Sequence, residues 1–412
     1  MKSILYIVAV ATLSLAPVAA QAQEQAMTLQ QCIDAALAAN LDMKRGEVSA
    51  ERARAMQGTA CDIDKTSVSL SQDPTSGGSP DNGITVSQSF EFPTVYAARH
   101  KWLKAETEVA RRGLGQARNV LVRDVSACYY SLLRARRVAE ILQAQDSICR
   151  KFVALASARH KAGEAGSLEL MNAQRACSEN LIERGKAEKA VLSAKMSLRQ
   201  LLNTDRDVVP ADTLLSAIGY DGHAVGFAET PLGEVYAARK TAAERSLGLA
   251  RQGYMPSISV GFTTQLLIKG FNPYDVERSR FDKGNLMAFE VGVGVPLFWG
   301  AHKARVRAAR QDVELAEISR RQAEQQQGRE LADWHNELCR ARRVLDYYTR
   351  QGLAQATEMA RLSQVSYEAG EIGYVEYIQN QKASIDVQLQ YTAALDDYNQ
   401  AVIMLNYLNG NK

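Results

Sequence analysis

The 412-residue chain has few prolines and almost no excess charge. It contains 9 prolines, and its 49 basic and 46 acidic residues leave a formal net charge of +3. Disordered chains combine low hydrophobicity with a high net charge, whereas 46% of these residues are hydrophobic. Because the charges are spread along the chain, they form no basic footprint for nucleic acid. The composition therefore excludes a disordered protein, and we expect no nucleic-acid partner.

Active-site and metal-site motifs are also absent from the sequence. The six cysteines form no CxxC or other metal-type spacing, and the five histidines are scattered. No HExxH, GxSxG, Walker or dinucleotide-binding motif occurs. We therefore predict no catalytic residue, no cofactor, no metal site and no enzymatic activity. Cys32 and Cys128 fall on apolar positions of helical patterns, which favours buried thiols and leaves a disulfide as the open alternative.

Long hydrophobic runs are missing after the N-terminus, where an export signal stands. Lys2, an apolar run over 4–15 and the small residues Ala20 and Ala22 form the pattern of a signal peptide over 1–22. The run is shorter than the roughly 20 residues that a helix needs to span a bilayer, and an uncleaved anchor is the alternative. We expect an exported protein that is periplasmic, secreted or inserted in an outer membrane as a β-barrel.

The chain contains an internal repeat. Residues 163–174 read GEAGSLELMNAQ and residues 370–381 read GEIGYVEYIQNQ, at an offset of 207 residues. An offset of about half the chain length predicts a duplicated architecture. The expected halves are 23–204 and 231–412, and they are joined by a linker over 205–230.

Each half carries the same order of helical and strand patterns, with heptad seams along the long helices. The first half is expected to contain a helix over 28–58 with Thr28 as its N-cap, strands over about 62–73 and 84–92, a helix over 93–162, a turn at 163–166 and a helix over 167–203. The second half is expected to contain a helix over 231–252, strands over about 256–268 and 286–297, a helix over 299–369, a turn at 370–373 and a helix over 374–409. Helices of roughly 70 residues would be rods on the order of 100 Å long, so we predict one elongated body.

The four predicted strands have one apolar and one polar face each. Their length of roughly 10 residues is enough to cross a bilayer when tilted. Four strands cannot close a barrel, because the smallest bacterial outer-membrane barrels have eight. The strands therefore either cap a soluble domain or are pooled by several chains, and three chains would supply twelve. Since the apolar faces would otherwise be exposed to water, the pooled barrel is favoured.

This order of elements, given twice after an export signal, resembles the TolC-type outer-membrane efflux family over essentially the whole mature chain. TLQQCIDAALAAN (28–40) and MPSISVGF (255–262) resemble the family's opening helix and the start of its third strand, and the two glycine-turn motifs resemble its periplasmic tips. The resemblance implies a mainly α protomer with a small β part. It also implies a homotrimer with a 12-stranded outer-membrane β-barrel, continued by a 12-helix tunnel that extends into the periplasm.

The family's role is implied as well. The protein would be the exit duct of a tripartite efflux (RND-type) or secretion system in a Gram-negative bacterium, with a periplasmic adaptor and an inner-membrane pump as partners and with outer-membrane lipid around its barrel. The sequence does not identify the transported substrate. Two other classes stay open from the residues alone: a periplasmic coiled-coil adaptor or structural interaction protein, and an exported hydrolase.

The resemblance further implies a periplasmic gate. By position, Glu376 matches the first acidic residue of the family's gate ring, and Gln379 stands where a second acid is often found. Tyr367 and Glu169 are placed to bond between the two helical hairpins, which turn at 163–166 and 370–373. Ile372 occupies the position of the family's basic partner. The residues alone explain both glutamates equally as charges that favour the positive end of a helix dipole. The aromatic residues of the second tip suggest that the second hairpin moves and the first braces it.

The tips are also the expected docking site for the adaptor. The four glycines of the turns are expected to need positive φ angles, and the residues that follow them are expected to be exposed. The predicted docking tip consists of Gly163, Gly166, Ser167, Leu168, Gly370, Gly373, Tyr374 and Val375.

Overall fold

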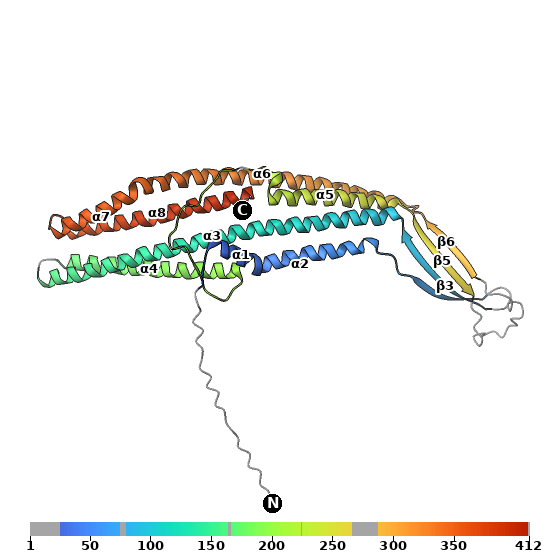
Figure 1. Ribbon diagram of the computed structural model, residues 1–412, viewed down its shortest axis with the longest axis horizontal. Coiled ribbons are helices and arrows are strands. Elements are labelled where there is room, and N and C mark those ends of the chain that lie inside the picture. The colour runs from blue at the N-terminus through green and yellow to red at the C-terminus, as the bar shows by residue number, and fades with distance from the viewer. Residues whose placement is uncertain (1–24, 75–79, 164–165, 224, 266–286, 411–412) are drawn as a thin grey trace, which may run out of the picture.

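The protein is an elongated molecule with a β-sheet at one end and the tips of two helical hairpins at the other (Figure 1). The computed structural model describes residues 25–74, 80–163, 166–223, 225–265 and 287–410. The predicted signal peptide over 1–22 lies outside these residues. Within the described ranges, no helix has the length and apolar content needed to cross a membrane.

The predicted first rod is confirmed as α3 (Pro93–Lys161), a helix of 69 residues. At 1.5 Å per residue it is about 100 Å long. α2 (Leu41–Met56) lies along its sheet-proximal part, and α4 (Ser167–Leu202) returns along its other part (Figure 1). The heptad seam faces these neighbours, since its buried members include Leu121, Val125, Leu132 and Leu142.

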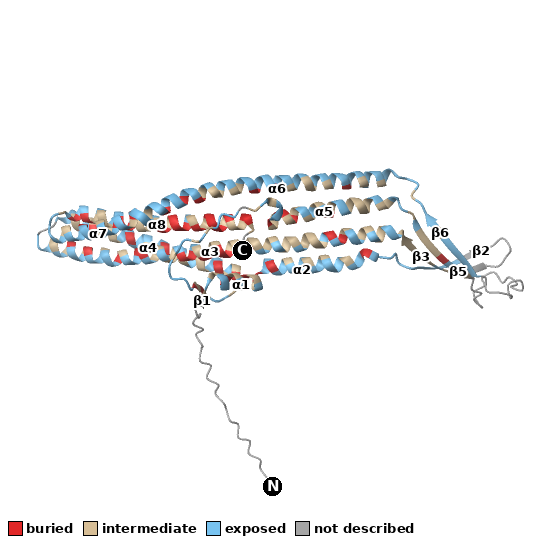
Figure 2. Cartoon of the chain, turned by 45° about the horizontal axis from the view of Figure 1, so that its top comes forward, coloured by how far each residue is buried: buried red, intermediate tan, exposed pale blue. Residues whose placement is uncertain are grey.

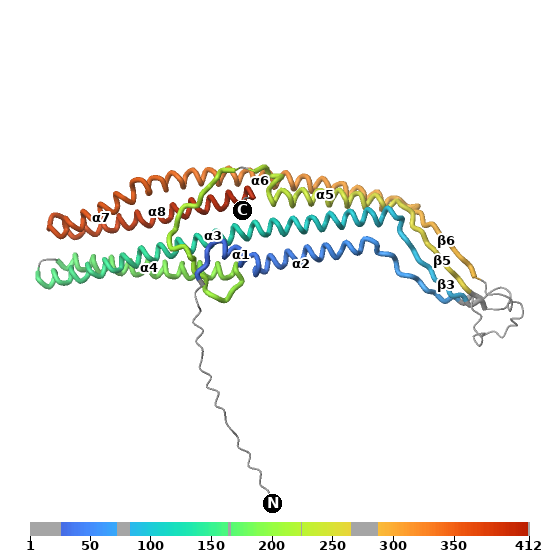
Figure 3. Tube along the Cα trace, viewed as in Figure 1, coloured from blue at the N-terminus to red at the C-terminus, as the bar shows by residue number. Residues whose placement is uncertain are grey.

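The second repeat has the same plan, but its rod is interrupted. α5 (Pro231–Arg251) and α8 (Tyr374–Asn409) lie beside α6 (Gly300–Tyr347) and α7 (Leu353–Glu368). The predicted continuous helix over 299–369 is wrong, because a π-helical turn, Tyr348–Gly352, separates α6 from α7, and the trace changes direction there (Figure 3).

Tight packing around a glycine accompanies this π-helical turn. Gly352 is buried, and a Cβ atom at its position would lie 2.8 Å from the Tyr348 ring. A π-helical turn inserts one residue into an α-helix, and no proline marks the insertion in the sequence. The sequence analysis therefore predicted a single helix.

The predicted helix over 28–58 is also two helices. Thr28 is confirmed as the N-cap of α1 (Leu29–Ala39), where it forms a capping box with Gln31. Asn40 then adopts an extended conformation, and its side chain accepts a hydrogen bond from the Asp42 backbone at 2.8 Å. Asn40 thus ends α1 and caps α2, as asparagine does at helix starts.

The linker over 205–230 contains structure that the sequence did not predict. β1 (Gln25–Met27) and β4 (Val208–Pro210) pair as parallel strands, and a short 3-10 helix, Phe227–Glu229, precedes α5. The Tyr129 hydroxyl of α3 donates to Asp212 Oδ2 at 2.7 Å. Asn399 of α8 binds the backbone of Ser216 and Ile218. The linker is therefore fixed to both repeats at the middle of the molecule.

Charged side chains also join the two repeats. Glu108 of α3 accepts hydrogen bonds from Arg111 and Arg112, and Arg112 also pairs with Glu234 of α5 at 2.6 Å. The hydrogen bond from Arg111 is the main cause that lowers the pKa of Glu108 to about 2. The carboxylate is therefore ionised at every physiological pH.

The strands form one antiparallel sheet in the order β2 (Ser67–Pro74), β3 (Pro80–Glu91), β5 (Ser257–Gln265) and β6 (Met287–Gly294). All four predicted strands exist. Residues 266–268 and 286 of the predicted strands lie outside the described residues. β3 pairs with β5, so the two predicted pairs of strands form a single sheet.

The register separates apolar from polar side chains on the two faces of the sheet. One row across the four strands consists of Val68, Val86, Phe262 and Phe289, and the neighbouring row on the opposite face consists of Ser67, Ser87, Gly261 and Glu290. The apolar face is uncovered, since Val68 and Phe289 are each 70% exposed (Figure 2 shows β6 as exposed). In water this face would be a large hydrophobic patch.

Candidate functional site

The helical hairpins α3–α4 and α7–α8 meet at their tips in a small aromatic core. Its buried residues come from both repeats and define what we call the tip cluster: Phe152, Ala156, Ala173, Tyr374 and Tyr377. The Phe152 and Tyr377 rings are 4.7 Å apart between centroids, and Tyr367 stacks on Tyr377 at 4.9 Å. Such aromatic pairs contribute about 0.5–1.5 kcal/mol beyond their buried area, so the cluster holds the tips together.

A polar bridge lies beside the tip cluster. Arg159 Nη1 of α3 donates to Glu169 Oε1 of α4 at 3.2 Å and to the Tyr367 hydroxyl of α7 at 3.1 Å. The structure thus brings the predicted pair Tyr367 and Glu169 together through a third residue, where the sequence suggested a direct bond. Arg159 supplies the cation that Ile372 does not.

Sequence analysis missed two residues of this site. Arg159 stands ten positions before Glu169, on opposite sides of the first turn, so the hairpin itself predicts that they approach. A cation in the last turn of a helix is also explained by the helix dipole, so the position of Arg159 did not by itself indicate a bond to another helix. Phe152 carries no comparable signal, because its partners are more than 200 residues away.

The prediction that Tyr374 is exposed is wrong. Its side chain is 6% exposed, inside the tip cluster, and burial raises its pKa to about 12. The ring turns inward because Phe152 of the other hairpin offers it an apolar partner at 6.1 Å. The other predicted docking residues are at the surface: Ser167 is exposed, Leu168 is 71% exposed and Val375 is 55% exposed.

The turn glycines divide into two kinds. Gly163 and Gly370 have φ angles of 78° and 77°, as predicted for a helix end that favours glycine. The same prediction is wrong for Gly166 and Gly373, whose φ angles of −75° and −77° are open to any residue. These two are the N-cap residues of α4 and α8, where the extended backbone is usual.

Glu376 and Gln379 lie outside the tip cluster. Both are exposed on the first turns of α8, and neither has a hydrogen-bond or ion-pair partner among the described residues. Glu376 is placed in the first turn, where a negative charge favours the helix dipole. The arrangement leaves both side chains free to face a partner or a pore.

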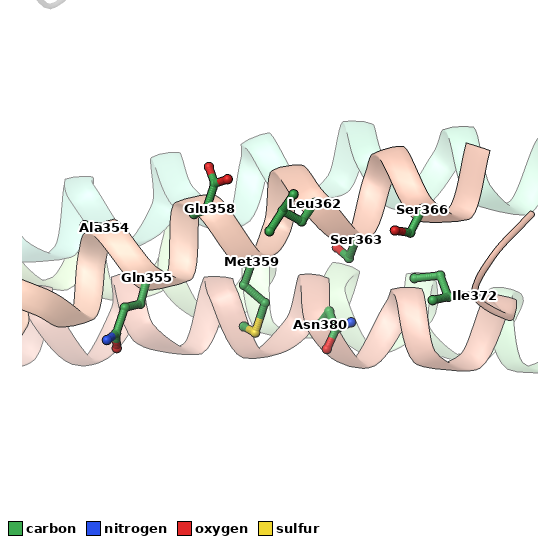
Figure 4. Close-up of a pocket in the computed structure, with 9 residues that line it drawn as sticks. All are labelled: Ala354, Gln355, Glu358, Met359, Leu362, Ser363, Ser366, Ile372 and Asn380. Carbon is green, nitrogen blue, oxygen red and sulfur yellow. The ribbon is translucent and has the colours of Figure 1, made fainter. Parts of the chain in front are cut away.

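Two hollows flank the tips. A shallow groove of about 610 Å³ runs along α7 and α8, and Figure 4 shows its lining residues: Ala354, Gln355, Glu358, Met359, Leu362, Ser363, Ser366, Ile372 and Asn380. A second cavity of about 390 Å³ lies between α3, α4 and α8, and Phe152 is one of its lining residues. The described residues include no cluster of three or more histidine, cysteine or acidic side chains that could hold a metal ion, and all six cysteines are free thiols.

The sequence matches the family model of the outer membrane efflux protein over residues 32–204 and 234–411. Among proteins with curated functions, none matches this sequence.

Solved structures with the same fold are similar over nearly the whole chain. A membrane protein from Pseudomonas aeruginosa is 20% identical, with a TM-score of 0.79 and 93% of each chain covered. The open state of the Neisseria gonorrhoeae MtrE outer membrane channel is 16% identical, with a TM-score of 0.76, and 93% of this chain and 89% of MtrE are covered. The Campylobacter jejuni CmeC outer membrane channel is 16% identical, with a TM-score of 0.74 and coverages of 93% and 85%.

The family match covers residues 32–204 and 234–411 and leaves out residues 205–233. It also decides against the adaptor alternative. The chain belongs to the outer membrane efflux protein family, and the protein is an efflux channel of the outer membrane.

Proposed function

We propose that three copies of the chain form the exit duct of a tripartite efflux or secretion system, with a 12-stranded barrel in the outer membrane and a 12-helix tunnel in the periplasm. The uncovered apolar face of the sheet carries this proposal. Its outer strands, β2 and β6, each have one unpaired side within the described residues. Free strand edges are normally protected or paired. Pairing β6 of one copy with β2 of the next would close the barrel and turn the apolar face toward lipid.

The polar face of the sheet suits a water-filled pore. It presents small and polar residues, with Ser259 beside Gly292 and Thr85 hydrogen-bonded to Thr263 at 3.0 Å. Small side chains leave room for solute, and the interior of open barrels is polar. The channel would transport substrate through water without changing it chemically.

The hairpin tips form the gate in this proposal. The tip cluster and the Arg159 bridge hold the second hairpin against the first, so breaking them would let α7 and α8 swing outward. The π-helical turn between α6 and α7 is a place where such a movement could begin, since π turns often mark functional sites. Three copies of Glu376 would add a ring of negative charge that favours cations.

An adaptor protein would dock on the exposed parts of the tips. Leu168 and Val375 are exposed apolar side chains next to the turns, and the groove on α7 and α8 begins beside Ile372. Exposed apolar residues beside a groove are typical of a surface that receives a helix. An inner-membrane pump would complete the system.

The barrel proposal is tested with a pair of matched substitutions. Val291→Arg places a cation on the apolar face of β6, at a cost of about 2–4 kcal/mol near the bilayer centre. Ser259→Arg places the same charge on the polar face, beside Gly292. We expect the wild type and Ser259→Arg to resist carbonate extraction and to run as a heat-modifiable trimer on a gel, and Val291→Arg to be lost from the outer membrane. Extraction of the wild-type protein as a monomer would refute the channel.

A further inference from the structure

The two helices that start at the sheet begin with cations and no acid. Residues 299–311, at the start of α6, include four lysines and arginines, and the first acid is Asp312. Residues 93–105, at the start of α3, include three, and the first acid is Glu106. The first turns of both helices lack the acid that would favour the positive end of a helix dipole.

Four other helices differ from these two. α1 and α7 have no acid in the first turn, whereas α2, α4, α5 and α8 each have one: Asp42, Glu169, Glu234 and Glu376. Farther along α6, cations are paired with acids three or four residues away, as in Arg320 with Glu317 and Arg340 with Glu337. The start of α6 therefore differs from these helices in the sign of its charges and from the rest of α6 in their pairing, whereas at the start of α3 Arg99 pairs with Glu91.

Three of the α6 cations form one exposed stripe. Lys303, Arg307 and Arg310 lie within about 60° of one another around the helix and span about 10 Å along it. They are exposed, and within the described part of the chain none of them makes an ion pair. The same helix face continues to Trp299, one turn before Lys303. We call these three cations the basic stripe.

The residues just before the basic stripe identify the surface on which it lies. Leu297, Phe298 and Trp299 are 78%, 90% and 61% exposed, and they follow directly on the apolar face of β6. Tryptophan is enriched where a protein crosses from hydrocarbon to headgroups. A span of about 10 Å beyond that point covers the headgroup layer and its edge. Lysine and arginine reach phosphates there while their stems lie along apolar surface.

We propose that the basic stripe binds the headgroups of anionic phospholipids in the periplasmic leaflet of the outer membrane. This proposal rests on the barrel described above and adds a lipid preference to it. The other available occupant is α2 of a neighbouring copy, which barrel closure would bring beside α6. α2 carries four cations and three acids over residues 41–56, so it offers no net negative charge to the stripe.

Fluorescence quenching by brominated lipids tests the proposal in proteoliposomes of the full-length channel. Trp102→Phe and Trp334→Phe leave Trp299 as the single reporter, because the chain has 3 tryptophans. We expect brominated phosphatidylglycerol to bind beside Trp299 at least about fivefold more tightly than brominated phosphatidylcholine, the effect of one cation near an anionic surface. High salt should abolish the preference, because it shortens the screening length to about 3 Å.

Two variants with equal charge change separate the stripe from net charge. The first replaces the basic stripe with glutamine, and the second replaces three exposed cations farther along α6 with glutamine: Arg329, Arg342 and Arg343. The ratio of the affinity for phosphatidylglycerol to that for phosphatidylcholine should fall to about one in the first variant and stay unchanged in the second. Lys303→Arg with Arg307→Lys and Arg310→Lys should retain it.

Three results would overturn the proposal. One is a wild-type channel without a lipid preference, and another is a stripe variant that keeps the preference. The third is a stripe variant that dissociates in phosphatidylcholine alone while its charge-conserving counterpart does not, which would assign the stripe to a contact between copies. A channel that fails to enter the outer membrane would instead refute the barrel, so the two failures are distinguishable.

Discussion

Removing one hydroxyl group from the tip should open the channel more often. Tyr367→Phe deletes the acceptor that Arg159 Nη1 contacts at 3.1 Å and keeps the ring that stacks on Tyr377. A hydrogen bond to a charged group contributes about 1.5–3 kcal/mol. Because the Arg159 side chain is 35% exposed, the lower value of about 1.5 kcal/mol applies. That corresponds to roughly a tenfold shift toward the open state for each protomer.

Single-channel recording in planar bilayers measures this shift as open probability. Tyr96→Phe is the matched control, since the Tyr96 hydroxyl accepts a hydrogen bond from the Glu91 backbone at 2.9 Å at the sheet end of α3, far from the tips. The control should leave gating unchanged. If Tyr367→Phe changed the open probability by less than about twofold, or if Tyr96→Phe had an equal effect, the Arg159 bridge would not be part of the gate.

Three further predictions concern stability. Gly370→Ala should accelerate hydrogen exchange at the second tip, because a positive φ costs a non-glycine residue about 1–2 kcal/mol, whereas Gly373→Ala should not; equal effects would contradict the assignment. Because folding lowers the pKa of Glu108 from about 4.5 to about 2, its ionised carboxylate stabilises the fold fully above pH 4.5, and this stability is lost as the pH falls toward 2. Between pH 4.5 and 2 the melting temperature of Glu108→Gln should therefore fall less than that of the wild type. Parallel melting curves for the two proteins would argue against this contribution of Glu108. Tyr129→Phe should destabilise the middle of the molecule by about 1–3 kcal/mol in thermal unfolding, with Tyr130→Phe near neutral, and a silent Tyr129→Phe would mean that the linker is held elsewhere.

Local patterns in the sequence were sufficient to predict the elements of the fold. Strand alternation gave the four strands, and the apolar and polar rows of the sheet follow from a side-chain period of two. Thr28 and Pro93 marked helix starts by capping chemistry and by the fixed φ of proline. The errors in the helices lie where a helix is interrupted without a proline, at Asn40 and at the π-helical turn.

The site was less predictable, because its contacts join distant parts of the chain. The family resemblance placed Tyr367 and Glu169 at the tips, yet Arg159, which links them, was missed. Tyr374 reads as an exposed turn residue in the sequence and is buried in the structure, since Phe152 lies opposite. A one-dimensional pattern holds no information on which helix faces meet.

The amino-acid sequence by itself determined the duplicated plan, the length of the rods, the amphipathic strands and the turns at Gly163 and Gly370, because each depends on short-range periodicity or backbone conformation. Only the tertiary structure decided how the two hairpins are held together. The Arg159 bridge, the tip cluster and the pairing of β3 with β5 join residues separated by about half the chain, and such contacts exist only when the two repeats have folded against each other.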